Sequence, residues 1–207
     1  MFRRKEYHDN LADLHNYDVN VYTREIHLNS LLSSREDEEM GVDYSMALRF
    51  IKNIKFLENQ NLDPIIIRQC TVGGDWNYGM AIYDAIKSCR CNTTIVCYAH
   101  ARSMSSIIPQ AANRRIIMPN CDFMVHYGTI SLNEISQAAK TSIDQNELAS
   151  KRMLNIYAER CLHSNFFNDY SLKEIVEFID KQIRNHVDWY LTPEKACELG
   201  FMDAIGK

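Results

Sequence analysis

The chain has 207 residues, enough for one domain with a substantial hydrophobic core. Its 46% hydrophobic and 24% charged residues are ordinary for a soluble globular protein, and the net charge of −4 argues against nucleic acid as the main partner. No uninterrupted apolar stretch is long enough to cross a membrane, and no apolar signal region follows the basic residues 1–8. We therefore expect a cytoplasmic protein that works away from membranes.

The seven cysteines are an odd number and do not form the framework of a small secreted domain, so we expect reduced thiols. The nearest approach to a metal-binding pattern is Cys89-x-Cys91 with Cys97-x-x-His100. Its spacing is loose, and Cys97 lies in an apolar run where it is expected to pack as a small hydrophobe. We therefore expect no metal site.

The N-terminal third predicts a short arm and the first strand–helix unit. Residues 1–16 are polar and lack sustained periodicity, so we expect a mobile arm, followed by one domain over residues 17–207. Apolar residues at helical spacing follow Asp43, a good N-cap residue. The predicted elements are strands over 17–22 and 24–28, an acidic surface loop over 33–41, a helix over 43–57 and a buried strand over 64–69.

The middle of the chain continues the alternation of strands and helices. Pro109 is tolerated only near the start of a helix, which suits a helix that begins near Ser103. Such alternation predicts a largely parallel sheet with right-handed crossovers, which binds ligands at the carboxyl ends of its strands. The predicted elements are a helix over 76–89, a strand over 93–98, a helix over 103–112 and strands over 115–118 and 122–127.

The C-terminal part is mainly helical. A broken apolar stripe predicts one long helix over residues 132–162. Ser171 and Glu174 have capping-box spacing at the start of a second helix. A Thr-Pro pair at residues 192–193 starts the last helix, and Gly200 ends it.

A serine stands where the strand over 93–98 gives way to the next helix. At such a turn the hydroxyl of Ser103 can be held forward of the backbone, and the helix N-terminus behind it offers unpaired N–H groups. Those groups can hold the oxyanion that forms when a serine attacks a carbonyl. Serine is also a common N-cap, and the turn taken alone favours capping. Upstream, Gly73 and Gly74 follow a buried strand and allow the backbone to approach a ligand closely.

These segments resemble the Clp protease proteolytic subunit family of self-compartmentalising serine peptidases. The family has a strand, Pro-Gly-Gly and a helix with Gly-Met-x-Ile-Tyr-Asp, and this chain has Gly73-Gly74 and then Gly79-Met80-Ala81-Ile82-Tyr83-Asp84. The family's Ala-Ser-Met corresponds to Arg102-Ser103-Met104. Its Arg-x-x-x-Pro-Asn and the His-bearing strand that follows correspond to Arg115, Pro119-Asn120 and His126. The resemblance covers residues 22–205 and keeps the motifs in order.

A serine nucleophile needs a base, and the base needs an orienting partner. His126 is the candidate base because it ends the strand after the Ser103 helix, and beside the other motifs a catalytic role outweighs a structural one. Asp188 is the candidate third member, since it precedes Trp-Tyr-Leu-Thr and a helix as the family's catalytic Asp does. Its alternative is an acid near a helix start. Asp180 and Asp203 are the other candidates for this role.

The resemblance implies an α/β fold of the crotonase/ClpP-like type, a repeated β-β-α sheet with a protruding handle helix over residues 132–162. It implies a serine endopeptidase that hydrolyses unfolded proteins and peptides inside an oligomeric chamber, with the N–H groups of Gly74 and Met104 as the oxyanion hole. The implied partners are further copies of the chain, seven to a ring with a stacked tetradecamer as an option. An ATP-dependent unfoldase is a further option. No metal or organic cofactor is implied.

Three departures from the family pattern leave its partner contacts open. Residues 127–131 replace the Gln-Pro and glycine-rich strand that pairs with substrate by strand addition. His186-Val187 stands where the family often has an acid–Arg pair that links two rings. Residues 166–185 form a longer segment than the family norm, and the N-terminal region differs from the usual axial loop.

Two other functions compete with an active peptidase. A catalytically silent structural subunit of such a ring is disfavoured because all three triad residues are retained, and labelling of Ser103 by a fluorophosphonate probe separates the two. A crotonase-like acyl-CoA enzyme would share the general fold. The Ser103-Met104 motif with His126 disfavours that alternative, and a CoA-binding assay tests it.

Overall fold

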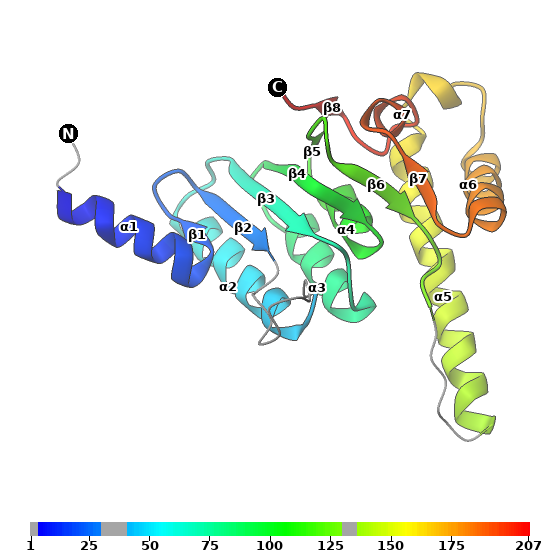
Figure 1. The fold of residues 1–207 in the computed structure, drawn as a ribbon, viewed down its shortest axis with the longest axis horizontal. Helices are drawn as coiled ribbons and strands as arrows, with labels where there is room; N and C mark the ends of the chain where they lie inside the picture. Colours follow the sequence, from blue (N-terminus) through cyan, green and yellow to red (C-terminus); the bar gives the residue numbers. More distant parts are fainter. Residues whose placement is uncertain (1–3, 30–40, 130–135) are drawn as a thin grey trace.

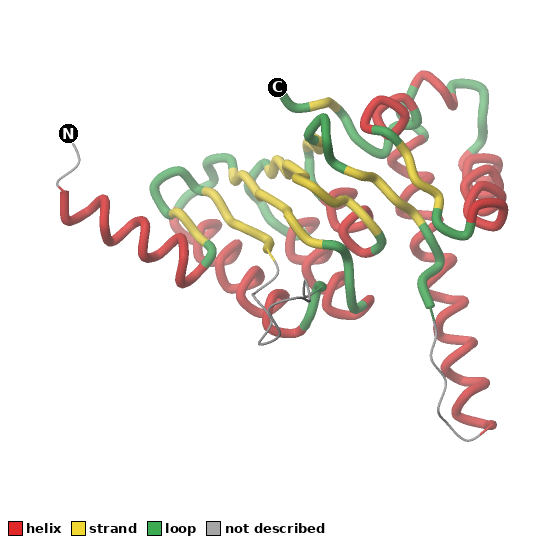
Figure 2. The backbone as a smooth tube through the Cα atoms, in the orientation of Figure 1, coloured by secondary structure: helices red, strands yellow, loops and turns green. Residues whose placement is uncertain are grey.

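The computed structural model describes residues 4–29, 41–129 and 136–207. The strands of these residues form one eight-stranded sheet in the order β1-β2-β3-β4-β5-β8, with β6 paired to β4 and β7 paired to β6 (Figures 1 and 2). The strands are β1 (Val19–Asn20), β2 (Glu25–Asn29), β3 (Ile65–Thr71), β4 (Thr93–Arg102), β5 (Arg114–Ile117), β6 (Asp122–Val125), β7 (Trp189–Leu191) and β8 (Ala204–Ile205).

The sheet is largely parallel, as the alternation of strands and helices predicts. Strands β2, β3, β4, β5 and β8 pair in parallel, and β6 is parallel to β4. Only the pairs β1–β2 and β6–β7 are antiparallel within the described residues. This arrangement confirms the predicted α/β class and brings the ends of β4 and β6 to one edge.

Strand β4 is longer than the predicted strand over 93–98 because it changes neighbours along its length. Its first part pairs with β5, and His100, Ala101 and Arg102 pair with β6. Between these parts the register against β3 shifts, and Ala99 has a φ of 54°. A β-bulge of this kind bends a strand and redirects its side chains. The extension carries the chain to Ser103 at the same edge where β6 ends.

Helices α2, α3 and α4 cover one face of the sheet (Figure 1). The α-helices are α1 (Arg4–Tyr17), α2 (Tyr44–Gln60), α3 (Trp76–Lys87), α4 (Met104–Ile107), α5 (Ser136–Cys161), α6 (Leu172–His186) and α7 (Pro193–Glu198), and the 3-10 helices are η1 (Ile108–Ala111) and η2 (Asn165–Phe167). None of the helices in the described ranges combines the length and apolar character needed to cross a membrane.

Residues 4–17 form helix α1, which the lack of apolar periodicity did not indicate. The end of the helix is tied to α2: Asn53 Nδ2 donates to the Tyr17 carbonyl (2.6 Å), and Arg49 donates to the Asn16 carbonyl (2.9 Å). Arg49 also forms an ion pair with Asp18 (2.6 Å). The predicted mobility of residues 1–16 stays a prediction, and most of the predicted acidic loop over 33–41 lies outside the described residues.

The capping signals read from the sequence are present in the structure. The Asp43 side chain accepts from the Met46 N–H at the start of α2 (2.8 Å). Ser171 and Glu174 form a capping box at the start of α6. Thr192 caps α7, and Gly200 follows that helix with a φ of 85°, which favours glycine.

The segment predicted as one helix over 103–112 is two short helices. Helix α4 ends at Ile107, and η1 begins at Ile108 with Pro109 in its first turn. Proline has no N–H to donate and its ring crowds the preceding turn, so the α-helix cannot continue through it. Gln110 restores one bond by donating from Nε2 to the Ser106 carbonyl (2.8 Å).

Helix α5 protrudes from the body of the molecule (Figure 1). Its C-terminal half is buried, including Leu154 and Tyr157, whereas Ile143 and Leu148 in its N-terminal half are 41% and 56% exposed. The helix confirms the protruding element of the predicted fold over residues 136–161, and residues 132–135 lie outside the described residues.

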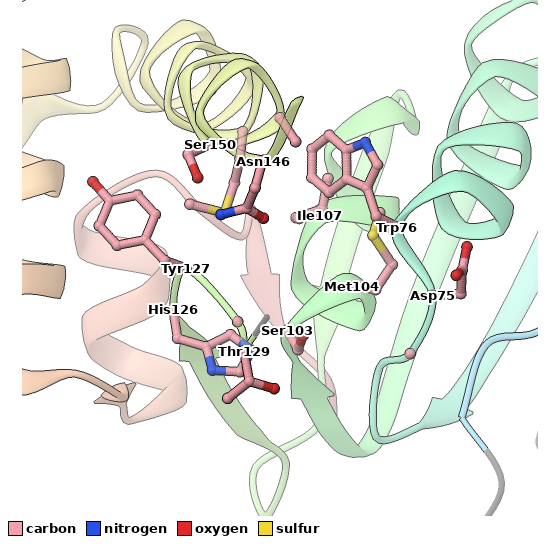
Figure 3. A pocket seen from close by; sticks show the side chains of 14 residues that line it. Asp75, Trp76, Ser103, Met104, Ile107, His126, Tyr127, Thr129, Asn146 and Ser150 are labelled. Atoms are coloured by element: carbon pink, nitrogen blue, oxygen red, sulfur yellow. The ribbon is translucent and has the colours of Figure 1, made fainter. Parts of the chain in front are cut away.

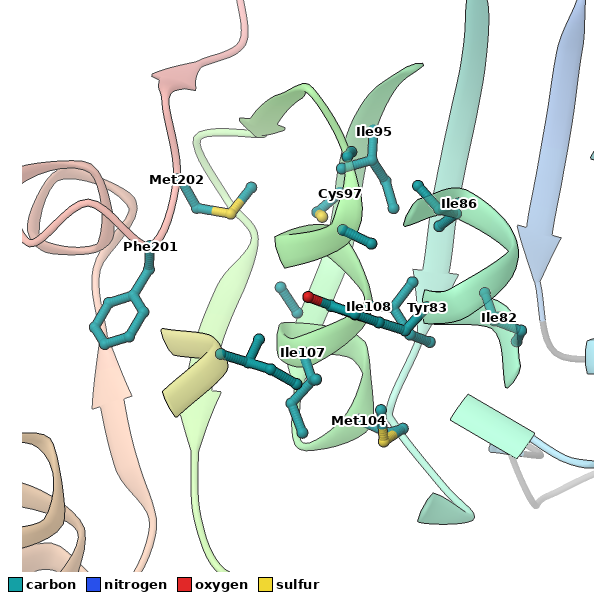
Figure 4. Packing of buried hydrophobic residues seen from close by; sticks show 14 of the residues in the cluster. Ile82, Tyr83, Ile86, Ile95, Cys97, Met104, Ile107, Ile108, Phe201 and Met202 are labelled. Carbon is teal, nitrogen blue, oxygen red and sulfur yellow. The ribbon is translucent and has the colours of Figure 1, made fainter. Parts of the chain in front are cut away.

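The hydrophobic core lies directly behind the Ser103 turn (Figure 4). Ile82 and Ile86 of α3 pack there with Ile95 of β4 and Ile108 of η1, all nearly inaccessible to solvent. Burial of each such side chain stabilises the fold by about 1.5–3 kcal/mol. The residues that follow Ser103 are therefore part of the hydrophobic core.

Candidate active site

Ser103 lies at the N-cap position of α4, but its side chain does not cap the helix. Its backbone has φ 53° and ψ −127°, a conformation that costs a residue with a side chain about 1–3 kcal/mol. The Ser103 N–H donates to the Met124 carbonyl of β6 (3.0 Å), which fixes the turn beside that strand. The structure therefore contradicts the alternative that the Ser103 side chain caps the helix. A strained strand-to-helix turn is a known way to present a serine hydroxyl.

A chain of buried hydrogen bonds supports this turn from below. Ser106 Oγ donates to the Ser103 carbonyl (2.7 Å) and lies 2.6 Å from the Tyr157 hydroxyl. Because Ser106 has only one hydroxyl proton, Tyr157 of α5 must donate to Ser106. Gln69 of β3 donates to the Ser105 carbonyl (2.7 Å). These bonds connect the turn to both α5 and the sheet.

The Met104 side chain packs against Gly79 of α3. A Cβ atom at Gly79 would overlap the Met104 side chain. Glycine is thus required at this point for α3 to lie close to the first turn of α4. The contact fixes the position of Met104, whose N–H stands at the start of the helix.

The glycine pair lies next to the Ser103 turn. Gly73 and Gly74 have φ values of 111° and 147°, and a Cβ at Gly73 would lie 2.8 Å from the Ser103 Cβ. The Gly73 carbonyl accepts from the Val42 N–H, and the Val42 carbonyl accepts from the Asp75 N–H (2.9 Å). In a trans peptide the N–H points opposite to the carbonyl, so the Gly74 N–H points away from Val42. It is therefore left free of the sheet and available to a ligand.

His126 and Asp188 are in direct contact although they are 62 residues apart in the sequence. His126 follows β6, Asp188 precedes β7, and the antiparallel pairing of Val125 with Trp189 brings the two ends together. His126 Nδ1 lies 2.9 Å from Asp188 Oδ1. Because a carboxylate only accepts, His126 donates from Nδ1–H, and in a neutral imidazole Nε2 is then the acceptor nitrogen.

His126 Nε2 has no hydrogen-bond partner in the described part of the chain, and no bond joins it to Ser103 Oγ there. The structure thus joins two of the three predicted triad members and places the third in the same cavity. Nucleophile–base bonds are often long or badly aligned without substrate and shorten in the complex.

The turn before Asp188 is a second strained point. Val187 has φ 64° and ψ −67°, and the Asp188 N–H donates to the His186 carbonyl (2.8 Å), which closes a three-residue turn. A positive φ is unusual for a β-branched residue. Asp188 is not the cap of the next helix, because Thr192 has that role. The alternative interpretation of Asp188, as an acid that caps the start of a helix, is therefore excluded.

The two other candidate acids have different partners. Asp203 forms an ion pair with Arg115, which also donates to the carbonyls of Gly200 and Phe201. Asp180 accepts from Tyr127 and Arg184. Only Asp188 among the three contacts His126 in the described residues.

A cavity of about 380 Å³ lies above Ser103 and His126 (Figure 3). Met104, Ile107 and Trp76 form apolar walls, and Asn146 and Ser150 of α5 add polar groups opposite. Sequence reasoning did not identify Asn146 or Ser150, because nothing in a helical stripe shows which cavity its residues will line.

A cluster of side chains fastens the three strands just below the site. Arg102 donates to Asp122, and its guanidinium carbon lies 5.5 Å from the centre of the Tyr190 ring. The hydrogen bond to Asp122 raises the pKa of Arg102 above its usual value. In the register of the sheet, Arg102 pairs with Met124 and Met124 pairs with Tyr190. The cluster therefore connects β4, β6 and β7 close to Ser103 and His126, which follow β4 and β6, and to Asp188, which precedes β7.

The loose cysteine pattern does not gather into a metal site. No group of three or more His, Cys, Asp or Glu side chains in the described ranges is arranged to hold a metal ion. Cys97 is fully buried in β4, and burial raises the pKa of its thiol. The structure pairs none of the described cysteines in a disulfide.

Topology and the protruding α5 make this chain an α/β protein of the crotonase/ClpP-like fold. A mutant of ClpP1 from Listeria monocytogenes has the same fold, with a TM-score of 0.71 and 20% identity over 90% of this chain and 93% of that one. The family model described as Clp protease matches residues 29–207. The chain therefore belongs to the Clp protease family, and this excludes the crotonase-like acyl-CoA enzyme as the family assignment.

Relatives within the family are distant in sequence. An ATP-dependent Clp protease proteolytic subunit from Deinococcus radiodurans is 22% identical over 169 residues, which cover 79% of this chain and 76% of the relative. Subunit 1 from Chlamydia trachomatis is 28% identical over 164 residues, with 77% and 79% covered. Subunit 1 from Chlamydia abortus is 29% identical over 160 residues, with 75% and 77% covered.

Proposed function

We propose that this protein is a serine endopeptidase that cleaves peptide bonds of short or unfolded chains, with Ser103, His126 and Asp188 as its triad. The observation that carries the proposal is the hydrogen bond between His126 Nδ1 and Asp188 Oδ1, together with a strained Ser103 that lines the same cavity as His126. Membership of a peptidase family supports it independently.

In the proposed mechanism, Ser103 Oγ attacks the substrate carbonyl carbon while His126 Nε2 takes the hydroxyl proton. Asp188 holds the imidazole through Nδ1 and stabilises the imidazolium that forms. The N–H groups of Gly74 and Met104 stabilise the negative charge on the substrate oxygen. His126 then gives its proton to the leaving amine, and water hydrolyses the acyl-enzyme by the reverse proton path.

The proposed assembly is a homo-oligomeric ring, seven subunits in one ring, with an ATP-dependent unfoldase as a partner for folded substrates. The exposed apolar residues of α5 support an assembly, since an apolar stripe on a protruding helix needs a partner surface. The lack of disulfides among the described cysteines is in keeping with the reducing cytoplasm.

One observation favours a second candidate, a catalytically silent subunit of such a ring. In the described residues Ser103 Oγ and His126 Nε2 are not hydrogen-bonded. A silent subunit would keep the fold and the ring contacts without the proton transfer that activates serine. This candidate makes the opposite prediction for the reactivity of Ser103.

Fluorophosphonate labelling followed by peptide mass spectrometry separates the two candidates. The probe reacts with a serine that an adjacent base has activated, so the peptidase should carry one label on Ser103. Labelling should disappear in His126→Ala and persist in His163→Ala, a histidine outside the site. An unlabelled Ser103 in folded, assembled protein would instead establish the silent subunit.

A further inference from the structure

A second connection joins the His126 strand to the Asp188 segment. Tyr127, the residue after His126, donates its hydroxyl proton to Asp180 of α6. Arg184, one turn further along α6, donates from Nε to both Asp180 oxygens (3.0 and 2.8 Å). The Arg184 guanidinium carbon also lies 5.8 Å from the centre of the Tyr127 ring. Three groups thus form one cluster between β6 and α6.

Helix α6 leads almost directly into Asp188. It ends at His186, and the tight turn at Val187 closes with the Asp188 N–H on the His186 carbonyl (2.8 Å). With only one residue between the helix and Asp188, any shift of α6 along its axis moves the Asp188 carboxylate. Together with the pairing of β7 with β6, the position of α6 therefore affects where the Asp188 carboxylate lies in the 2.9 Å His126–Asp188 bond.

Apolar packing holds α6 on the protein but does not by itself fix its axial position. Ile175, Ile179 and Ile183 bury one face of the helix, and the Phe178 ring lies 6.3 Å from that of Trp189. Hydrophobic contacts are non-directional, whereas a charge-assisted hydrogen bond has a defined length and angle.

We propose that Tyr127 and Asp180 are positioning residues: their hydrogen bond sets α6, and with it the Asp188 carboxylate, in register with the imidazole of His126. This inference rests on the proposed function in taking Asp188 as the partner of a working base. It assigns a role to two side chains that touch neither the nucleophile nor the substrate carbonyl.

The protonation states keep this bond in place at neutral pH. Hydrogen bonds from Arg184 hold the pKa of Asp180 below its usual value, so Asp180 is an acceptor. Burial and the Asp180 carboxylate raise the pKa of Tyr127 above its usual value, so the phenol keeps its proton. Donor and acceptor are both in the required form across the range where His126 must act as a base.

The decisive variant is Tyr127→Phe, which removes only the hydroxyl and leaves the ring in the cavity wall. We expect kcat to fall about tenfold with KM unchanged, as expected for a misaligned catalytic group. If Tyr127 acts through Asp188, then Tyr127→Phe combined with Asp188→Asn should be no slower than Asp188→Asn alone. Additive losses in the double variant, or an unchanged kcat in the single variant, would overturn the proposal.

Matched variants test the bond itself. Tyr98→Phe also removes a phenol bonded to a charged group, Arg68 (2.7 Å), but on β4 away from the site, and should retain activity. Asp180→Asn keeps an oxygen acceptor for Tyr127 and should lose less than Asp180→Ala. Equal losses of kcat in Tyr98→Phe and Tyr127→Phe would indicate a general loss of stability and would overturn the positioning role.

A readout that needs no activity separates this inference from the proposed function. Proton NMR of the folded protein should show a downfield signal for the His126 Nδ1 proton bonded to Asp188. The signal should be lost in Asp188→Asn, lost or broadened in Tyr127→Phe, and kept in Tyr98→Phe. If the wild-type protein is inactive and unlabelled but the NMR signal follows this pattern, the proposed peptidase function is refuted and the positioning role of Tyr127 and Asp180 is supported. A wild-type signal that survives Tyr127→Phe unchanged refutes the positioning.

Discussion

At the scale of single residues, the strained backbone of Ser103 is the most informative feature of the site. A non-glycine residue is held at φ 53° with a side chain that caps nothing. Strain of about 1–3 kcal/mol persists only where the surroundings impose it. The surroundings here are the bond to the Met124 carbonyl and the Ser106–Tyr157 chain beneath.

Ser103→Ala should lower peptidase kcat by roughly 10⁶-fold while the fold is kept, because the proposed nucleophile is removed and no cap bond is lost. The measurement is steady-state cleavage of a fluorogenic peptide by protein purified free of host proteases. Ser88→Ala, at the end of α3, is the control and should be unaffected. Wild-type rates in Ser103→Ala would exclude this serine as the nucleophile.

His126→Ala should reduce kcat about as much as Ser103→Ala, since triad members act as a unit. Asp188→Asn should lower kcat by roughly 10⁴-fold, less than loss of the serine, because it spoils the imidazole tautomer without removing a reacting atom. Asp203→Asn is the comparison, because it removes a charge of the same kind that is paired with Arg115. The Asp203→Asn variant should have a lower free energy of unfolding and a kcat close to that of wild type. An unchanged kcat in Asp188→Asn would transfer the role to another acid.

At the scale of elements, the contact between α3 and the start of α4 is as important as the residues that react. Met104 contributes a proposed oxyanion N–H, and its side chain packs where only glycine fits on α3. The close approach of α3 to α4 therefore fixes the direction of the Met104 N–H. Gly74, after β3, likewise leaves no room for a Cβ where it approaches the Val42 backbone.

Gly79→Ala should lower kcat by roughly tenfold to hundredfold, because the new methyl group pushes Met104 and tilts its N–H. Peptidase kinetics and thermal unfolding together check this, since overpacking also costs about 1–3 kcal/mol. Adding Met104→Ala makes room for the methyl group and should recover part of the lost kcat. No recovery, with a normally folded double variant, would count against this mechanism.

The turn between α3 and β4 contains a pH-sensitive contribution to stability. The Glu58 carboxylate of α2 accepts from the Arg90 N–H (2.7 Å) and from Lys55 (2.9 Å). These bonds lower the pKa of Glu58 from 4.5 to about 2. Because the folded value lies below the unfolded one, the contribution is complete above pH 4.5 and is lost as pH falls toward 2.

Glu58→Gln should therefore be less stable than wild type at pH 7, and the difference should shrink toward zero near the folded pKa of about 2. Urea unfolding over this pH range measures it. Glu198→Gln removes a surface pair with Lys195 and should show almost no difference at any pH. A pH-independent deficit in Glu58→Gln would mean that its charge is not what stabilises the turn.

At the scale of the whole molecule, the protruding α5 determines what the protein can do as an assembly. Its buried half holds Tyr157 beneath the Ser103 turn, and its exposed half carries Ile143 and Leu148. Val187, where the ring-linking ion pair of the family would stand, is 75% exposed and uncharged. For the proposed assembly, this exposed and uncharged residue favours a single ring over a stacked pair.

Native mass spectrometry at micromolar concentration should show a homo-oligomer, with seven subunits as the expected ring. Leu148→Glu should shift the population toward smaller species, because it places a charge on the exposed apolar stripe. Lys151→Glu, one turn further along an exposed face, is the control and should assemble normally. A fully active monomer would refute the ring.

An enclosed chamber also predicts a restricted range of substrates. The purified protein should cleave short peptides and unfolded chains but leave a stable folded protein intact unless an unfoldase is added. Gel analysis of matched folded and permanently unfolded forms of one substrate tests this. Digestion of both forms at equal rates would mean that the active sites are not sequestered.

The local pattern of the sequence was sufficient for most helices and strands, although it did not indicate α1 or the break between α4 and η1. Helical spacing predicted α2, α3 and α5, and capping signals predicted Asp43, Ser171 and Thr192. Motif order was sufficient for the family. These features depend on neighbours within a few residues, so they can be read without knowing the fold.

Only the tertiary structure decided how distant segments meet. The His126–Asp188 bond follows from the pairing of β6 with β7, and the exclusion of Asp180 and Asp203 follows from their other partners. The strained turn at Val187 is likewise a feature of the tertiary structure, whereas the break of the helix at Pro109 follows locally from the missing N–H and the ring of proline. The physical reason is that periodicity constrains the face of an element, whereas a hydrogen bond between side chains depends on where two elements lie in space.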